Sequence, residues 1–283
     1  MAIKKLIVCG DSFAAPSKDL PGTAHGEVLA KKLGWNVEIL ARQGCSNGGI
    51  RVQIDEVLRQ RPDFAIIAPT FHDRMEIPAS NAPWVPPENE NKGWGSDLQS
   101  HLQKNHDIGY DPAAGIDNVN YGDNDYRMIC ETIFSLVENY PHPYRSQKIS
   151  KDAQNAMKQY INFLYDSQWK LQQDRWIIRD GIMQLFYSGI PFLLVANTIW
   201  NSNTVREAFP SVVPDKYFTL AFEETPAYAS NEWELKNKNK DPGYHTEPEG
   251  QEYLADVYYK IITERFGREP DRKSRRLNSS HIP

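Results

Sequence analysis

The first 70 residues alternate short apolar runs with amphipathic stretches, and this order limits the chain to a small set of folds. Three apolar runs have the length and branched side chains of buried strands: residues 3–9, 36–40 and 64–68. Between them, residues 25–33 and 49–60 repeat apolar side chains at helical spacing and stop at Gly34 and ahead of Pro62. A β-α-β-α-β order predicts a parallel sheet with right-handed crossovers.

The remaining residues predict further layers around that sheet. We expect helices in three segments: residues 125–140, 150–187 and 247–266. Thr246 and Glu249 form a capping box for the last helix, and residues 191–196 read as another buried strand. Residues 78–122 contain prolines, glycines and asparagines without apolar periodicity, and we interpret them as an inserted, partly ordered lid. The predicted fold is an α/β three-layer α-β-α sandwich with about five parallel strands in flavodoxin-like order.

The composition favours one domain and argues against several partners. A chain of 283 residues, 40% of them hydrophobic, suits one α/β domain with an insertion, which we place at residues 1–270. The net charge of -5 gives no basic surface for nucleic acid. No apolar run reaches the roughly 18 residues of a membrane span, and the N-terminal run is shorter than a signal peptide requires. We therefore expect a cytoplasmic protein, although a particle-associated one would have the same features.

The cysteines and the last residues carry two further expectations. Three cysteines without C-x-x-C spacing predict neither a disulfide framework nor a zinc site. Residues 271–283 lack apolar periodicity and resemble the conceptual translation of a sequencing adapter. We expect this tail to be non-native, and the natural C-terminus and the oligomeric state stay open.

Three polar loops follow the predicted strands. They are G-D-S-F at residues 10–13, G-C-S-N at 44–47 and T-F-H-D at 70–73. Because the carboxyl ends of parallel strands meet at one edge of a sheet, we expect the loops to converge. Ser12 would present its hydroxyl and its own N–H there, an arrangement suited to acyl transfer. Asp and Ser are also ordinary turn residues after a strand.

Taken together, these blocks resemble the SGNH (GDSL-like) hydrolase superfamily. The resemblance rests on G-D-S-F, A-R-Q-G-C-S-N-G-G-I, P-D-F-A-I-I-A-P-T-F-H-D-R and D-P-G-Y-H-T-E-P-E-G, in this order, and it does not cover residues 78–189. The style of the second and third blocks is closest to SGNH-like proteins of phage and environmental sequences. The resemblance implies a hydrolase with an α/β fold, and we expect no cofactor.

Carried over to this sequence, the resemblance makes Ser12 the nucleophile and His245 its general base. Asp241 would orient the imidazole, but the family spacing is Asp-x-x-His and this chain has one residue more, which also allows a Ser-His dyad. The alternative role for His245 is that of a polar residue ahead of a helix.

The resemblance also implies an oxyanion hole made by the N–H groups of Ser12 and Gly44 and a donor from the third loop. His72 occupies the position where the family has asparagine, and Thr70 is the other candidate donor; a purely structural loop is the alternative. Asn47 would hold the second loop or touch the substrate, the former being favoured. For Arg74 a structural pair with Glu76 is preferred over binding an anion.

Several other binding functions lack their motifs. The glycines of residues 44–49 match neither a dinucleotide fingerprint nor a P-loop. His101 and His106 have no metal-ligand partners at a useful spacing, so no metal is expected. Trp84 and Trp94, in the inserted segment, would suit stacking on a sugar.

The sequence therefore predicts a serine ester hydrolase that works through an acyl-enzyme. The resemblance suggests substrates with short acyl groups, including acetyl esters of carbohydrates, so the partner is a small-molecule or glycan ester. The alternative is a catalytically impaired SGNH-like module that binds glycan or has a structural role, for instance in a viral particle.

Overall fold

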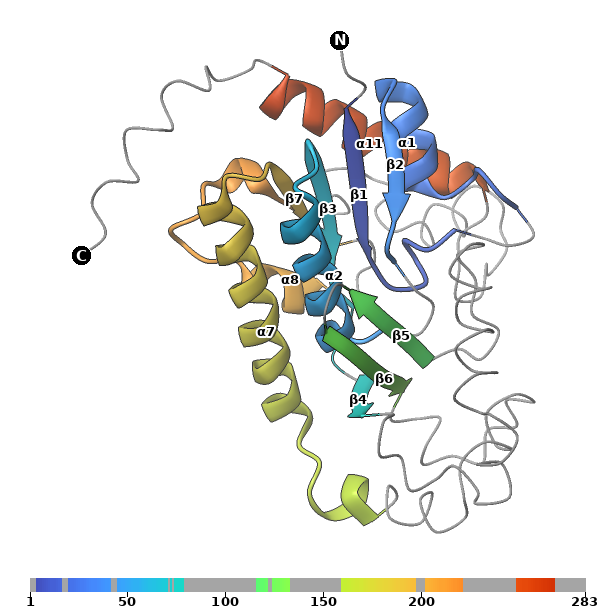
Figure 1. Cartoon of the computed structure of the whole chain (residues 1–283). Coiled ribbons are helices and arrows are strands. Elements are labelled where there is room, and N and C mark those ends of the chain that lie inside the picture. The colour runs from blue at the N-terminus through green and yellow to red at the C-terminus, as the bar shows by residue number, and fades with distance from the viewer. Residues whose placement is uncertain are drawn as a thin grey trace, which may run out of the picture.

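A five-stranded parallel sheet lies at the centre of the molecule (Figure 1). Its strands are, in chain order, β1 (Lys5–Gly10), β2 (Asn36–Ile39), β3 (Phe64–Ala68), β7 (Phe192–Val195) and β8 (Phe218–Thr219). Their spatial order is β2-β1-β3-β7-β8, and every pair is parallel. This is the flavodoxin-like order, so the predicted α/β fold class is confirmed.

The computed structural model describes the larger part of the chain. The described residues are 4–16, 20–41, 45–70, 72, 74–78, 116–121, 124–132, 159–196, 202–220 and 248–267. In this part no helix is both long enough and apolar enough to cross a membrane. The predicted tail, residues 271–283, lies outside it.

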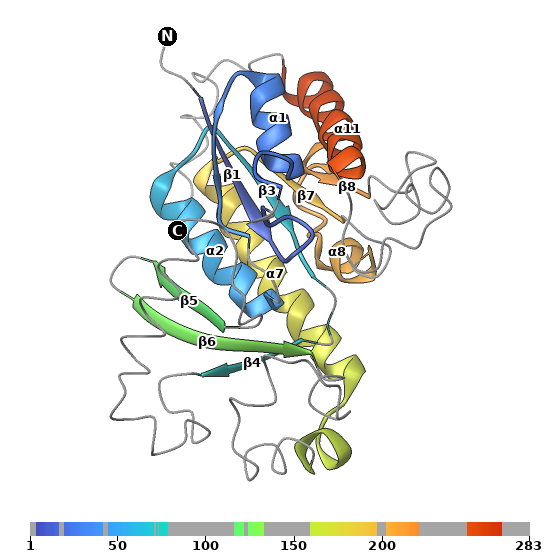
Figure 2. The ribbon, with the colours of Figure 1, turned by 90° about the vertical axis from the view of Figure 1, so that its right-hand side faces the viewer.

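Helices cover both faces of the sheet (Figures 1 and 2). One face carries α1 (His25–Leu33) and α11 (Pro248–Phe266), and the other carries α2 (Asn47–Gln60), α7 (Ser167–Ser188) and α8 (Ser202–Ala208). A short 3-10 helix, η2 (Asp215–Tyr217), precedes β8. The molecule is thus the three-layer sandwich that the alternating sequence predicts.

The central strands alternate their side chains between two cores. In β1, Leu6 and Val8 pack into the core beneath α1 and α11, whereas Ile7 and Cys9 pack into the core beneath α2 and α7. Every side chain of β3 is also buried. A strand covered on both faces reads as a continuous apolar run, which explains why F-A-I-I-A shows no polar alternation.

The helix ends follow local rules. Ser46 caps α2, and its hydroxyl accepts the Gly49 N–H at 3.3 Å. The Asp166 side chain accepts the Trp169 N–H at 2.7 Å and begins α7. Gly34 ends α1 in the left-handed conformation, with φ 68°, as its sequence position predicts.

A second sheet lies beyond the carboxyl ends of the parallel strands (Figure 2). It is antiparallel, in the order β4-β6-β5, and consists of β4 (Arg74–Pro78), β5 (Ile116–Tyr121) and β6 (Asn124–Thr132). We call it the accessory sheet. It lies against α2.

The accessory sheet corrects one prediction from the sequence and adds detail to another. The helix expected over residues 125–140 is wrong where the structure describes it, because Asn124–Thr132 is a strand. Tyr126, Ile129 and Cys130 fit helical spacing, but Tyr126, Met128 and Cys130 equally fit a strand, and pairing with two distant strands decides the outcome. The lid expected over residues 78–122 also ends in a strand, β5. Residues 79–115 and 133–140 lie outside the described residues.

The helical stretch expected over residues 150–187 is confirmed from Ser167 onward as α7, but residues 164–166 are not helical and separate α7 from a helical turn at residues 159–163. The last helix, expected over 247–266, begins at Pro248. Thr246, its predicted cap, lies outside the described residues.

Candidate active site

Ser12, the predicted nucleophile, lies in the tight turn that leaves the carboxyl end of β1. Gly10 ends this strand, and a Cβ there would lie 2.9 Å from the Ala14 Cβ and 3.1 Å from the Ala68 carbonyl oxygen. Only glycine allows this close approach to β3 without a shift of the backbone. Ser12 is partly exposed, whereas the residues on either side of it are buried. The turn therefore leaves the serine as its accessible member.

Asp11 connects this turn to the loop after β3. Its Oδ1 accepts the Phe13 N–H at 3.0 Å, and its Oδ2 accepts the Thr70 hydroxyl at 2.7 Å. Arg74 Nη1 lies 3.4 Å from the same Oδ2 and donates to the Cys45 carbonyl oxygen at 2.7 Å. A buried carboxylate requires such partners, because burial removes its hydration. Asp11 thus fixes the Ser12 turn relative to the other two loops.

Gln53 of α2 holds the same strand end from the other side. Its Oε1 accepts the Gly10 N–H at 2.7 Å, and its Nε2 donates to the Gly10 carbonyl oxygen at 3.2 Å. The Nε2 group also lies 3.3 Å from the Cys45 Sγ. One amide side chain therefore satisfies both backbone groups of the residue two positions before Ser12.

Asn47, the first residue of α2, holds the loop after β3. Its Oδ1 accepts the Thr70 N–H at 2.9 Å, and its Nδ2 donates to the Thr70 carbonyl oxygen at 2.9 Å. The Nδ2 group also donates to Asp174 Oδ2 of α7 at 2.9 Å. Asn47 and Thr70 are both buried. The side chain of Asn47 therefore holds the third loop, whereas we expected it to hold the second loop or to touch the substrate.

Gln251, in the first turn of α11, reaches the Ser12 turn from the opposite face of the sheet. Its Nε2 donates to the Phe13 carbonyl oxygen at 3.4 Å, and its Oε1 accepts the His25 backbone N–H at 2.9 Å. The His25 Nδ1 lies 2.9 Å from the same Oε1. Since the two backbone groups fix the orientation of the amide, Nδ1 carries the proton and donates. Gln251 thus joins α1, α11 and the turn.

His25 is fully buried, and its Nε2 has no hydrogen-bond partner among the described residues. Burial lowers the pKa of His25 to about 4, because the charged ring would bury a second N–H at that position. The hydrogen bond to Gln251 and the charge of Asp11 act in the opposite direction but are weaker. The imidazole is therefore neutral at pH 7.

His72, the candidate donor from the third loop, is partly exposed. Partial burial lowers its pKa, and the nearby positive charges of Lys170 and Arg175 on α7 lower it further. A neutral imidazole carries one N–H and can donate it without adding a charge to the site.

The structure brings four of the predicted site residues to the carboxyl ends of β1 and β3. Thr70 and Asn47 are bonded to each other, Thr70 is bonded to the residue before Ser12, and His72 follows Thr70 by two positions. The Thr70 hydroxyl donates its proton to Asp11, so in this arrangement it donates to no substrate. Gly44, Asp241 and His245 lie outside the described residues.

Five residues that hold these loops were not predicted: Asp11, Gln53, Lys170, Asp174 and Gln251. From the sequence we expect Asp11 only to be an ordinary turn residue after a strand. The sequence does not indicate the other four, which lie in helices, because a polar residue within an amphipathic helix is ordinarily solvated. For Arg74 the described side chains show an ion pair with Asp11; the side chain of Glu76, its expected partner, lies outside them.

Among the described residues no three His, Cys, Asp or Glu side chains are grouped so that they could hold a metal ion.

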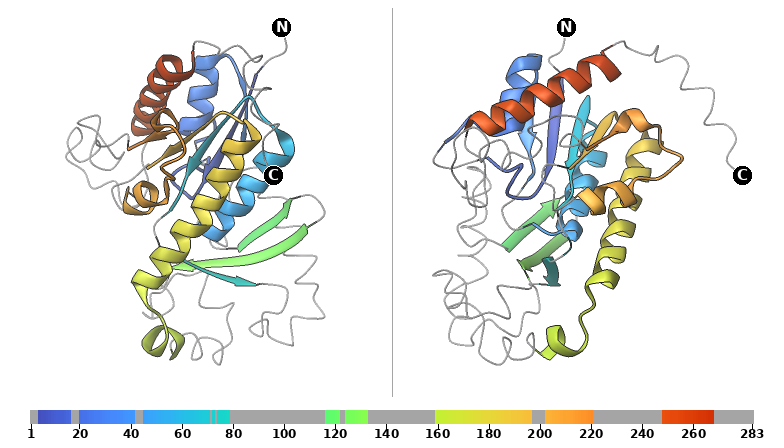
Figure 3. Two further views of the ribbon diagram at one scale, coloured as in Figure 1. Left: turned by 90° about the vertical axis from the view of Figure 1, so that its left-hand side faces the viewer. Right: turned by 180° about the vertical axis from the view of Figure 1, so that it is seen from behind.

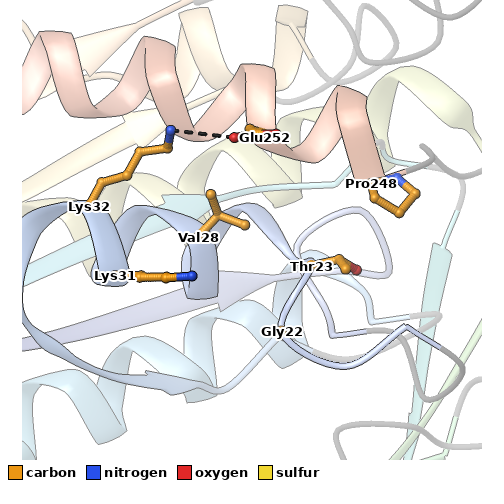
Figure 4. Close-up of a pocket in the computed structure, with 7 residues that line it drawn as sticks. All are labelled: Gly22, Thr23, Val28, Lys31, Lys32, Pro248 and Glu252. Atoms are coloured by element: carbon orange, nitrogen blue, oxygen red, sulfur yellow. Dashed lines mark ion pairs between the residues drawn. The ribbon is translucent and has the colours of Figure 1, made fainter.

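A cavity of about 460 Å³ lies between α1 and the start of α11 (Figure 4). It is lined by Gly22, Thr23, Val28, Lys31, Lys32, Pro248 and Glu252. Lys32 bridges to Glu252 at 3.6 Å and to Asp256 at 2.8 Å. Its described lining residues include none of Ser12, Asn47, Thr70 and His72. Figure 3 shows α1 and α11 side by side on this face of the sheet.

Comparisons with known proteins give resemblances in structure only. No protein-family model matches the sequence, and no curated protein matches it either. Among the solved structures that resemble the chain is the acetyl xylan esterase AlAXEase, with a TM-score of 0.41 and 9% identity; the match covers 91% of this chain and 99% of that chain. Another is a protein described as a putative lipolytic protein of the G-D-S-L family from Desulfitobacterium hafniense DCB-2, with a TM-score of 0.30, 11% identity and the same coverage. Because both TM-scores lie below 0.5, the fold assignment rests on the sheet order of this chain.

Proposed function

We propose that this protein is a serine hydrolase of the SGNH (GDSL-like) type that cleaves esters through an acyl-enzyme on Ser12. The observation that carries the proposal is the support of the Ser12 turn. Side chains from three separate elements fix it: Gln53 holds Gly10, Thr70 holds Asp11, and Gln251 holds Phe13. A preorganised turn at the carboxyl end of the first parallel strand is what a nucleophilic serine requires.

The position of α11 supports His245 as the general base. The helix begins at Pro248, and its residue Gln251 bonds to the residue after Ser12. His245 precedes Pro248 by three positions, and such a segment spans at most about 10 Å. The chain is therefore short enough to keep the imidazole near the hydroxyl, with Asp241 as the residue that would orient it.

In the proposed mechanism His245 takes the Ser12 proton while Oγ attacks the ester carbonyl carbon. The oxyanion would receive hydrogen bonds from the N–H groups of Ser12 and Gly44, and His72 would supply the third. Collapse of the intermediate expels the alcohol, which takes the proton from His245. Water activated by the same imidazole then attacks the acyl group and restores Ser12.

The substrates that we propose are esters with short acyl chains, including acetyl groups on carbohydrate. The test is hydrolysis of p-nitrophenyl acetate, butyrate and octanoate by the wild-type protein and by Ser12→Ala. We expect the wild type to prefer the acetate, and the variant to lose activity by a factor on the order of 10³ or more.

Ser188→Ala is the matched control. The Ser188 hydroxyl donates to the Leu185 carbonyl oxygen at the far end of α7, so its loss should leave the rate unchanged. A fluorophosphonate probe should label Ser12 in the wild type and in the control. Equal rates for wild type and Ser12→Ala would refute the proposal and favour the non-catalytic, glycan-binding alternative.

A further inference from the structure

We infer that Asp174 of α7 is a positioning residue for the loop after β3, which it holds through Asn47; the inference rests on the serine hydrolase function proposed above. The two residues lie on different helices, 127 positions apart in sequence. Among the described residues Asp174 is hydrogen-bonded to Asn47 and Lys170, and we assign neither of them a part in the chemical steps. Its effect would reach the reaction through the side chain of Asn47 and the backbone of Thr70.

The first step is the geometry of the Asn47 amide. This group makes three hydrogen bonds of 2.9 Å, two to the backbone of Thr70 and one to Asp174. The bonds to Thr70 require the amide to present its oxygen to an N–H and its nitrogen to a carbonyl. The bond from the nitrogen to the carboxylate favours this same orientation, because a flipped amide would place its oxygen against a negative charge.

The second step is the pairing of Asp174 with Lys170. Lys170 Nζ donates to Asp174 Oδ1 at 2.5 Å, while Oδ2 accepts from Asn47. Asp174 is 0% exposed and Lys170 8%. A buried ion pair contributes little net stability compared with apolar side chains, but it can fix one arrangement of its neighbours. The lysine holds one oxygen of the carboxylate, and the other oxygen accepts from Asn47.

The third step connects this arrangement to the Ser12 turn. Thr70, whose backbone Asn47 holds, donates its hydroxyl to Asp11, and Asp11 accepts the Phe13 N–H. A continuous path of hydrogen bonds therefore runs from α7 to the residue after Ser12. Loss of the Asp174 carboxylate would let the Asn47 amide rotate and would loosen the third loop, which supplies His72 as the third oxyanion donor.

The same two helices provide a control contact. Asp180, also on α7, accepts hydrogen bonds from Arg51 of α2 at 2.8 and 2.9 Å. This contact joins α7 to α2 as the Asp174 contact does, but it is exposed and is not bonded to the third loop. A variant at Asp180 therefore weakens the packing of the helices without disturbing Thr70.

The experiment compares Asp174→Leu, Asp174→Asn and Asp180→Leu with the wild type, using p-nitrophenyl acetate. We expect Asp174→Leu to lower kcat by about 10- to 100-fold with KM changed by less than about threefold, because the defect lies in the placement of donors. Asp174→Asn keeps one acceptor oxygen for the two donors Asn47 and Lys170, so it should lose less kcat than Asp174→Leu but more than Asp180→Leu. Asp180→Leu should leave kcat unchanged.

A double-mutant cycle tests the route. If Asp174 acts through Asn47, Asn47→Ala combined with Asp174→Leu should be no slower than Asn47→Ala alone. Additive losses in kcat would overturn the inference, and so would a loss in Asp174→Asn as large as that in Asp174→Leu.

Hydrogen exchange separates this inference from the proposed function. The Thr70 N–H should exchange at least about tenfold faster in Asp174→Leu than in the wild type, while the Gly49 N–H at the start of α2 stays unchanged. A wild type without Ser12-dependent hydrolysis would refute the proposed function. In that case an unchanged Thr70 amide would also refute the positioning role, and a faster one would support it.

Discussion

The Ser12 turn is held from two sides of the sheet, and the two sides use different chemistry. On the side of α2 and α7 the supporting groups include charged pairs, Asp11 with Arg74 and Asp174 with Lys170. On the side of α1 and α11 the support is neutral, from Gln251 and an uncharged His25. We call these the charged side and the neutral side. We therefore expect removal of a charged side chain to weaken the charged side, and protonation of His25 at low pH to weaken the neutral side.

The largest expected effect comes from breaking the charged side at its centre. Asp11→Ala removes the carboxylate beside the buried guanidinium of Arg74, together with the acceptor for Thr70. Breaking a buried pair of this kind costs about 3–5 kcal/mol. We expect a loss of that size in the free energy of unfolding, measured by urea denaturation.

The control for this variant is Asp55→Ala, which removes an exposed partner of Arg51 on α2. Such a change costs less than about 1 kcal/mol. If Asp11→Ala is no more destabilising than Asp55→Ala, the charged side does not hold the turn.

The second effect, by size, comes from acid acting on the neutral side. The pKa of His25 is about 4 in the folded protein and 6.5 ordinarily, so the unfolded chain binds the proton first as pH falls. The contribution of His25 to stability is therefore complete above pH 6.5 and is lost progressively as pH falls towards 4. By linkage the loss is about 3 kcal/mol.

The measurement is urea denaturation at several pH values between 7 and 4, for the wild type and for His25→Asn. Carboxylates also titrate near the lower limit, so the difference between the two proteins isolates the contribution of His25. The wild type should lose more stability across this range. Parallel curves would show that His25 is not buried in its neutral form.

The smallest expected effect on stability comes from removing only uncharged hydrogen bonds on the neutral side. Gln251→Leu keeps the volume of the side chain but loses the bonds to His25 and to the Phe13 carbonyl oxygen. We expect a loss of about 2 kcal/mol, because buried polar groups lose partners while no charge is left unpaired. Gln251→Glu, which keeps an acceptor for His25, serves as the comparison and should raise the pKa of the imidazole, as followed by NMR titration.

The residues themselves show why the fold was largely predictable and the site only in part. The strands of the parallel sheet are local patterns, since a run such as F-A-I-I-A is buried on both faces wherever it lies. The accessory sheet is not local: Tyr126 and Cys130 fit two periods, and β6 becomes a strand because it pairs with β4 and β5. Ser12, Asn47 and Thr70 were found because loops after parallel strands converge.

The supporting residues could not be found in this way. Asp174 and Gln251 belong to helices far along the chain, and nothing in their spacing indicates which of them faces a loop. Only the packing of α7 and α11 against the sheet decides that. The sequence predicted which loops would lie together, but it did not indicate which side chains hold them in place.

Arg74 belongs both to the accessory sheet and to the support of the Ser12 turn. It is the first residue of β4, and its side chain reaches both Asp11 and the Cys45 carbonyl oxygen. We expect that an exchange of the accessory sheet for an unrelated segment, as in the engineering of new specificities, is tolerated when the graft begins after this arginine. A graft that replaces it would alter the turn even if every exchanged residue lay far from Ser12.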